Sequence, residues 1–388
     1  MEHNDKKPSV VVGLSGGVDS SVAAYLLKQQ GYHVMGMFMR NWHDTTGTLD
    51  GDCPWEDDRM FAELVAKKLD IEFHYIDLSE EYRTKVIDYM FAEYEKGRTP
   101  NPDVLCNREI KFAAFADAAF KLGADYVATG HYCQVQQHSN GEFELIAGKD
   151  KNKDQSYFLC QVNQKQLSKT LFPIGHLDKP EVREIALREG LATAKRKDSQ
   201  GICFVGKVDL PIFLQQKLKA KQGDIIEIPS DWDGYNNHDN IFEPYKYNKT
   251  DGVKIGEHNG AHFYTVGQRK GLGVGGKAEP LFVIGIDTVE NVVYVGMSDK
   301  HNGLYRKGLF TQSEEWHWLR PSAQIGVGES KQYDTRIRYR QPLQKATLEV
   351  KEDGYYITFD VAQKGAAPGQ FMAIYEGEEL VGSGVIHI

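Results

Sequence analysis

Six consecutive residues near the N-terminus have the composition of a phosphate-binding turn, namely Ser15, Gly16, Gly17, Val18, Asp19 and Ser20. A β-branched run, 10–12, precedes them, and an amphipathic stretch, 21–30, follows. This order predicts a buried strand, a glycine turn and a helix. Glycines let backbone N–H groups approach an anion, and a helix N-terminus adds partial positive charge. The turn lacks the lysine of a Walker A loop, so chemistry at a γ-phosphate is not expected.

Two of the five cysteines, Cys106 and Cys203, have surroundings that suit sulfur chemistry. Asn101 and Pro102 predict a helix start just before Cys106, and a helix N-terminus favours a thiolate. Asp103 lies three residues before Cys106, on the same helix face, where it could act as a general acid or base. Cys203 follows a glycine in a predicted loop that could move a thiol. Such a pair permits a thiol relay, although Cys106 could instead be an inert buried cysteine.

The elements that must position these residues alternate between short apolar runs and amphipathic stretches, from residue 10 to about 207. We expect strands at 33–39, 72–78 and 125–127, and a helix from 102 to Gly123. This pattern predicts a Rossmann-like α/β domain with a parallel sheet, whose strand ends line a ligand crevice. The polar loop 41–54 should lie beside that crevice. Met39 ends one strand, where it could pack on an adenine or simply belong to the core.

After residue 207 the pattern becomes mainly β. We expect a helix at 210–220, strands at 224–227, 263–266, 282–287 and 292–295, and a glycine-rich basic turn at 267–273. Residues 309–388 alternate again, which predicts a small β-barrel. Alternation at 335–340 would place Arg336, Arg338 and Arg340 on one strand face. We therefore expect an N-terminal domain (1–207), a central, mainly-β domain (208–283) and a C-terminal barrel (284–388).

Composition limits the class of protein. The formal net charge of −9 over 388 residues argues against a general nucleic-acid binder. The basic clusters at 149–153, 195–197 and 336–340 could still bind phosphates locally, or could be ordinary solvated surface. No apolar run is long enough to span a membrane and no signal peptide is evident, so we expect a cytoplasmic protein. The cysteine spacing is not that of a zinc finger and argues against a structural zinc site, and we expect no bound metal beyond a nucleotide counter-ion.

The motifs at 15–20, 97–107, 128–132, 153–159, 198–204 and 265–273 together resemble the bacterial tRNA-specific 2-thiouridylases, which are PP-loop ATP pyrophosphatases. The resemblance covers nearly the whole chain. It implies that ATP, with Mg²⁺ as counter-ion, adenylates the wobble uridine (position 34) of tRNA, and that sulfur then replaces its O2. In this family pattern Cys203 carries a persulfide and Cys106 resolves it through a transient disulfide; prior release of hydrosulfide remains an alternative.

The resemblance also implies binding residues. Those for ATP are Gly13, Leu14, Ser15, Gly16, Gly17, Val18, Asp19, Ser20, Met39 and Gly130. Those for tRNA are Asn101, Pro102, Asp103, His131, Lys153, Asp154, Gln155, Arg338, Tyr339, Arg340 and Gln341. Expected partners are tRNAs with lysine, glutamate or glutamine acceptors and a persulfide donor such as a cysteine desulfurase or a sulfur-relay protein.

Two other functions stay open at this point. A PP-loop amide-forming ligase would use the same adenylation without either cysteine, and a tRNA-binding module with a relict nucleotide site would not turn over ATP. The segment 229–252 is longer and more aromatic than the short hairpin that the resemblance implies.

Overall fold

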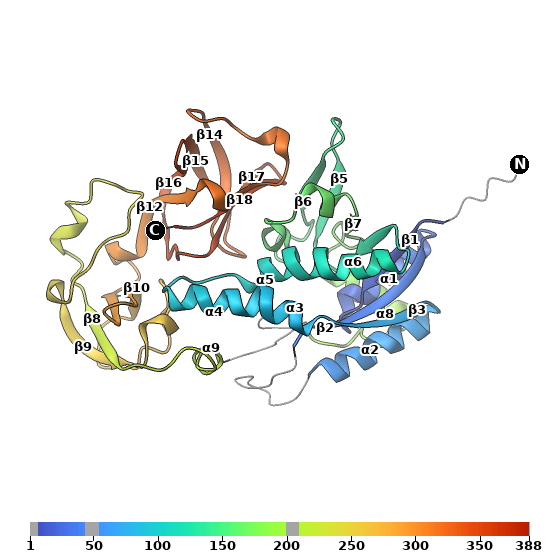
Figure 1. Ribbon diagram of the computed structural model, residues 1–388, viewed down its shortest axis with the longest axis horizontal. Helices are drawn as coiled ribbons and strands as arrows, with labels where there is room; N and C mark the ends of the chain where they lie inside the picture. Colours follow the sequence, from blue (N-terminus) through green and yellow to red (C-terminus); the bar gives the residue numbers. More distant parts are fainter. Residues whose placement is uncertain (1–6, 43–53, 199–208, 388) are drawn as a thin grey trace, which may run out of the picture.

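The computed structural model describes residues 7–42, 54–198 and 209–387. Figure 1 shows the N-terminal sheet at the right, the central part at the left, and the C-terminal barrel above helices α4 to α6. Cys53, Cys203 and most of the predicted loop 41–54 lie outside the described residues. No helix in the described ranges is both long and apolar enough to cross a membrane.

The N-terminal part is built on a parallel sheet with the strand order β3-β2-β1-β4-β7. The predicted α/β class is confirmed, and the three predicted strands are present with small changes at their ends. The strands are β1 (Ser9–Gly13), β2 (His33–Arg40), β3 (Glu72–Asp77), β4 (Tyr126–Ala128) and β7 (Thr170–Leu171).

Each face of this sheet has its own core, because successive residues of a strand point to opposite faces. Val10 and Val12 pack with the first group of helices, whereas Val11 packs with the second. The first group is α1 (Val18–Gln29), α2 (Pro54–Leu69) and α8 (Lys179–Arg188). The second is α3 (Ser79–Tyr82), η1 (Arg83–Ile87), α4 (Asp88–Glu95), α5 (Pro102–Leu105), η2 (Cys106–Ala114) and α6 (Phe115–Lys121).

The elements α5, η2 and α6 follow one another without a break, and we call them the Cys106 helix. Asn101 caps its start, since its side-chain oxygen accepts a hydrogen bond from the backbone N–H of Val104 at 3.2 Å. Pro102 is the first helical residue, and Gly123, with φ +87°, follows the end. The predicted start and stop of this helix are therefore confirmed.

The central part contains a sheet with the order β10-β11-β8-β9. Its strands are β8 (Gly223–Glu227), β9 (Val253–His258), β10 (Leu281–Asp287) and β11 (Val292–Met297), and α9 (Leu210–Leu214) precedes them. The predicted strand at 263–266 is wrong, because a 3₁₀ turn, η6 (Ala261–Phe263), leads there into irregular chain. The expected boundary between residues 283 and 284 falls inside β10, and the sheet continues to Met297.

The segment 229–252 has little regular structure beyond the turns η4 (Asp233–Tyr235) and η5 (Lys249–Asp251). Aromatic contacts hold it instead: Trp232, Tyr235 and Tyr247 pack against one another and onto the central sheet. At its far side Phe242 meets Tyr356 of the barrel with ring centroids 5.0 Å apart. The segment therefore bridges the central sheet and the barrel.

The C-terminal part is an antiparallel, barrel-like sheet. Its strands are β12 (Tyr305–Gln312), β13 (Trp316–Trp318), β14 (Ser330–Arg336), β15 (Gln344–Lys351), β16 (Gly354–Lys364), β17 (Phe371–Glu376) and β18 (Glu379–Val385). The hairpin β5 (Cys133–Gln137) and β6 (Phe143–Ala147) comes from the N-terminal part but joins this sheet, where β6 pairs with β18. Short helical elements lie between the strands. Two of them, η3 (Ser156–Leu159) and α7 (Gln164–Leu167), lie between β6 and β7; the others, between β11 and β14, are η7 (Asn302–Leu304), η8 (Ser313–Glu315) and η9 (Pro321–Ala323).

The prediction of one strand face bearing three arginines is wrong. Strand β14 ends at Arg336, and residues 338–341 form a turn in which the N–H of Gln341 donates to the carbonyl of Arg338 at 3.3 Å. Arg340 has φ +62°, a left-handed conformation that a continuing strand excludes.

Candidate functional site

The glycine turn at 15–20 is shaped for an anion. Gly16 has φ +73°, and a Cβ there would collide with the backbone of Asp58. A Cβ on Gly130 would lie 2.7 Å from backbone atoms of Asp19 and Ser20, so the end of β4 closes directly onto the turn. Helix α1 begins after Gly17 with no side chain capping its N-terminus. Its first N–H groups therefore remain available for an anion, as the sequence predicts for a phosphate cradle.

The hydroxyl groups of the turn hold its shape. The N–H of Ser15 donates to the Oγ of Ser20 at 3.1 Å, and that hydroxyl donates to the carbonyl of Gly17 at 3.2 Å. From outside, the guanidinium of Arg196 donates to the carbonyl of Gly16 at 3.0 Å and pairs with Asp58 at 2.8 Å. These bonds fix the turn before any ligand arrives.

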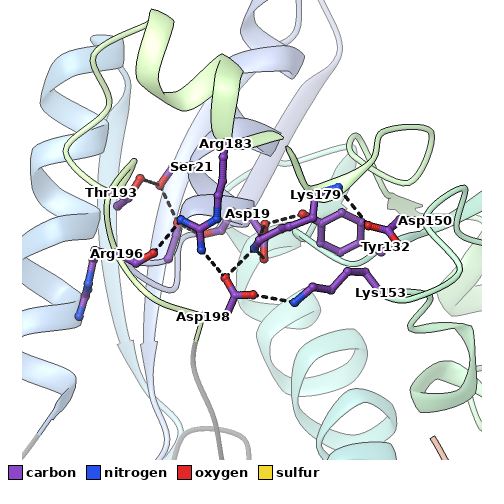
Figure 2. A network of polar contacts seen from close by, with 12 residues as sticks. Asp19, Ser21, Tyr132, Asp150, Lys153, Lys179, Arg183, Thr193, Arg196 and Asp198 are labelled. Carbon is purple, nitrogen blue, oxygen red and sulfur yellow. Dashed lines mark hydrogen bonds and ion pairs between the residues drawn. The ribbon is translucent and has the colours of Figure 1, made fainter. Parts of the chain in front are cut away.

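Lys179 is the main site residue that the sequence analysis missed. Its ammonium group lies 2.7 and 2.9 Å from the two carboxylate oxygens of Asp19 and 2.8 Å from Asp198, as Figure 2 shows. Tyr132 donates a further hydrogen bond to Asp19 at 2.7 Å. The available signal was its position: a lysine in the first turn of a helix is electrostatically unfavourable unless an anion faces it.

Asp198 joins several cations at the edge of this site. It pairs with Lys153 at 2.7 Å and with Arg183 at 2.8 Å, in addition to Lys179. Partial burial disfavours its charged form, but the hydrogen bonds from Lys153 and Lys179 outweigh burial and lower the pKa of Asp198 to about 2. Asp198 is thus an anion at every ordinary pH, and it is the last described residue before the segment that contains Cys203.

Cys106 is fully buried where the N-terminal part meets the barrel. The next residue, Asn107, donates its side-chain N–H to the carbonyl of Phe158 at 3.0 Å. The ring of Phe158 packs on Tyr339, with centroids 4.4 Å apart. The Cys106 helix, the 153–159 motif and the 338–341 turn, at which a strand was predicted, therefore come together around Asn107 and Tyr339. Asp103 lies on the same helix, half-buried.

Two other cysteines have the properties of inert core residues. Cys133 and Cys160 are buried free thiols. Burial raises the pKa of Cys133 well above its usual value and that of Cys160 to about 12. Neither is a thiolate near neutral pH, so neither is suited to act as a nucleophile.

Several predicted tRNA contacts have hydrogen-bond partners inside the protein. His131 is buried, lies 2.7 Å from the hydroxyl of Thr129, and has its pKa lowered by burial and by nearby Lys111, which keeps it neutral. Asp154, also buried, accepts from Arg336 at 3.2 Å. Gln155 accepts from the N–H of Tyr132 at 3.0 Å. Arg336 is therefore a structural cation rather than part of an exposed basic face.

The 338–341 turn presents a different surface. Arg338 and Arg340 are exposed, whereas Tyr339 is half-buried against Phe158. Gln341 accepts from the N–H of Ile337 at 2.9 Å, which fixes the turn. The contact of this turn with RNA stays a prediction.

Met39 is buried, and its Cε would lie 3.6 Å from a Cβ on Gly13, beside Phe115. This position at the end of β2 is compatible with both interpretations, a core methionine or a support for adenine.

Three domain families match the chain. They are the tRNA methyl transferase HUP domain over residues 8–207, the tRNA methyl transferase PRC-barrel domain over 212–297 and the aminomethyltransferase beta-barrel domain over 310–386. Among solved structures, a 4-thiouridine synthetase–RNA complex with bound ATP aligns with a TM-score of 0.33 and 16% identity over 54% of this chain and 50% of that chain. That likeness is too weak to bear on function.

Curated relatives match from end to end. Proteins called tRNA-specific 2-thiouridylase MnmA from Christiangramia forsetii and Flavobacterium johnsoniae are each 57% identical to this chain, covering 97% of it and 99% of their own length. The Streptococcus thermophilus protein of the same name is 46% identical over 99% of this chain and 96% of its own length. Identity at this level, along the full length and across all three domain families, places the chain in the family of tRNA-specific 2-thiouridylases.

Proposed function

We propose that this tRNA-thiolating chain adenylates O2 of the wobble uridine, position 34, and replaces that oxygen with sulfur from a persulfide on Cys203. The observation that carries the adenylation step is the preorganised turn at 15–20, with Lys179 held at its edge. The N–H groups at the start of α1 would hold the α–β pyrophosphate. Lys179 would add positive charge as pyrophosphate leaves, and Mg²⁺ bound to ATP would offset the remaining phosphate charge.

The chemical steps balance as follows. O2 of the uracil attacks the α-phosphate of ATP, and pyrophosphate leaves. The terminal sulfur of the Cys203 persulfide adds to C2, and AMP leaves with the original oxygen. The thiolate of Cys106 then attacks the inner sulfur of Cys203, the S–S bond breaks, and the outer sulfur stays on the base. A disulfide between Cys106 and Cys203 results, and a thiol reductant returns both to thiols for the next turnover.

The remaining parts would hold the RNA. The uridine must leave the anticodon stack to reach a buried cysteine, and Asn101, Pro102 and Asp103 at the start of the Cys106 helix would contact it there. Asp103 would assist proton transfer. The exposed Arg338 and Arg340 would contact phosphates, which reconciles a net charge of −9 with tRNA binding. A separate cytoplasmic protein would supply the persulfide.

The test is incubation of the enzyme with ATP, a chemical persulfide donor and a tRNA transcript bearing an unmodified uridine at position 34. We expect AMP, pyrophosphate and a tRNA heavier by about 16 Da, the difference between sulfur and oxygen in the thiolated base. An amide-forming ligase would release pyrophosphate without this mass change, and a binding module would release none. Either result would reject the proposal. A transcript with cytidine at position 34 is the matched control.

A further inference from the structure

A turn of the C-terminal barrel lies against the residues that lead into the Cys106 helix. The N–H of Thr99 donates to the carbonyl of Pro368 at 2.6 Å. Gly369 has φ +87°, and a Cβ there would stand 3.0 Å from the backbone nitrogen of Thr99. The barrel turn at 368–370 thus contacts the backbone of the loop at 99–101, which leads into the Cys106 helix, directly and without intervening side chains.

Gln370 completes this contact. Its side-chain N–H donates to the carbonyls of Thr99 at 3.0 Å and of Pro100 at 3.1 Å, and both of these residues are buried. A buried carbonyl without a donor is unfavourable, so the loop favours the position in which Gln370 can reach both. A residue of the barrel therefore satisfies the backbone of a loop that lies some 270 positions earlier in the chain.

The same side chain also orients the helix cap. The side-chain N–H of Asn101 donates to Oε1 of Gln370 at 3.2 Å. This bond leaves the other end of the Asn101 amide facing the N–H of Val104, which it caps at 3.2 Å. Two linked hydrogen bonds thus run from Gln370 through Asn101 to the first turn of the helix that carries Asp103 and Cys106.

We propose that Gln370 is a positioning residue for Cys106 and Asp103: it holds the start of their helix in the place that sulfur transfer requires. This inference rests on the proposed function of Cys106. Its consequence is that the barrel acts on the chemistry through the backbone of residues 99–101, in addition to any part it has in holding RNA. Adenylation at the 15–20 turn is independent of this contact.

The experiment compares Gln370→Met, which keeps the length of the side chain but loses its hydrogen bonds, with Ser383→Ala. Ser383 is a matched control, because its buried hydroxyl donates to the carbonyl of Cys160 at 2.7 Å and so also links the barrel to the N-terminal part. Hydrogen exchange without tRNA gives the first readout. We expect the peptide covering 99–108 to exchange roughly tenfold faster in Gln370→Met, and not in Ser383→Ala.

Single-turnover kinetics give the second readout. In Gln370→Met we expect formation of thiolated tRNA to slow roughly tenfold while pyrophosphate release, which reports adenylation, and the tRNA Kd stay within about twofold of the parent. Unchanged exchange at 99–108, or a change equal to that in Ser383→Ala, would overturn the proposal. So would faster exchange with unimpaired sulfur transfer, or a weaker tRNA Kd with unchanged exchange, which would mean that Gln370 acts only by touching RNA. If the parent enzyme formed no thiolated tRNA, the proposed function would fail, while hydrogen exchange would still decide whether Gln370 holds the loop.

Discussion

Lys179 binds both carboxylate oxygens of Asp19, at 2.7 and 2.9 Å, and so places a buried ammonium group at the edge of the glycine turn. Lys179→Met should therefore lower tRNA-dependent pyrophosphate release by on the order of 100-fold, the usual effect of removing one charge-stabilising donor. Arg188→Met, on the exposed face of the same helix, is the control and should match the parent. Near-parental pyrophosphate release by Lys179→Met would remove this lysine from the reaction.

Asp19→Ala should abolish adenylation and leave tRNA affinity nearly unchanged, because nucleotide and anticodon stem are held by different segments. The loss should exceed that of a simple charge deletion, since the hydroxyl of Tyr132 loses its acceptor and Lys179 keeps only Asp198 as an ion-pair partner. Pyrophosphate release measures the expected loss of adenylation, and filter binding on the same preparation measures the expected unchanged tRNA affinity. Normal release by the variant contradicts the assignment.

The two proposed catalytic cysteines should fail at different steps. Cys203→Ser should still adenylate the tRNA and release pyrophosphate but carry no persulfide and form no thiolated tRNA, because a hydroxyl cannot hold transferable sulfur. Cys106→Ser should load sulfur on Cys203 and then stall for lack of a second thiol. Cys160→Ser should retain thiolation apart from losses of stability, since burial raises the pKa of that thiol to about 12. Mass spectrometry of the enzyme decides, and a persulfide on any cysteine other than Cys203 would overturn the scheme.

Arg336 and Arg338 should give opposite results, although they are two residues apart. Arg336 pairs with buried Asp154 and lies 4.9 Å above the ring of Tyr375. Its alanine variant should lose about 3 kcal/mol of stability by leaving a buried carboxylate unpaired. Arg338→Ala and Arg340→Ala should unfold like the parent but bind tRNA more weakly, with a shallower dependence of affinity on salt. Urea unfolding and binding titrations at several salt concentrations distinguish the two effects.

The contribution of the Asp198 ion pairs to the free energy of unfolding should depend on pH. Its folded pKa, about 2, lies below the unfolded value near 3.9, so its ion pairs stabilise the fold above pH ~4 and this stabilisation is lost as pH falls toward 2. The difference in unfolding free energy between the parent and Asp198→Asn should therefore be constant from pH 5 to 7 and shrink below about pH 4. A constant difference down to pH ~2 would contradict this account.

The sequence allowed the local parts of the site to be predicted well. Strand, glycine turn and helix around Ser15–Ser20 follow from adjacent residues, as does the Asn101 cap of the Cys106 helix. Lys179 was missed because its role depends on long-range geometry. It lies 160 positions from Asp19 in the sequence, and the residues of its own helix do not indicate that Asp19 is its partner. Arg336 shows the opposite error. The alternating pattern at 335–340 predicted that Arg336 lies on an exposed strand face. In the structure the strand ends at Arg336, the chain turns at 338–341, and Arg336 is largely buried because it pairs with Asp154.

The hairpin β5–β6 has a consequence for synthesis on the ribosome. Its partner strand β18 is translated roughly 230 residues later, which at about 5–20 residues per second is a delay on the order of ten to fifty seconds. During that interval the nascent N-terminal part exposes an unpaired strand edge, the kind of surface that chaperones cover and that otherwise pairs between chains. A fragment ending at residue 207 should accordingly form aggregates that dilution during refolding suppresses, and light scattering would measure them. A monodisperse fragment would show that the exposed edge of the hairpin does not cause aggregation in the absence of the barrel.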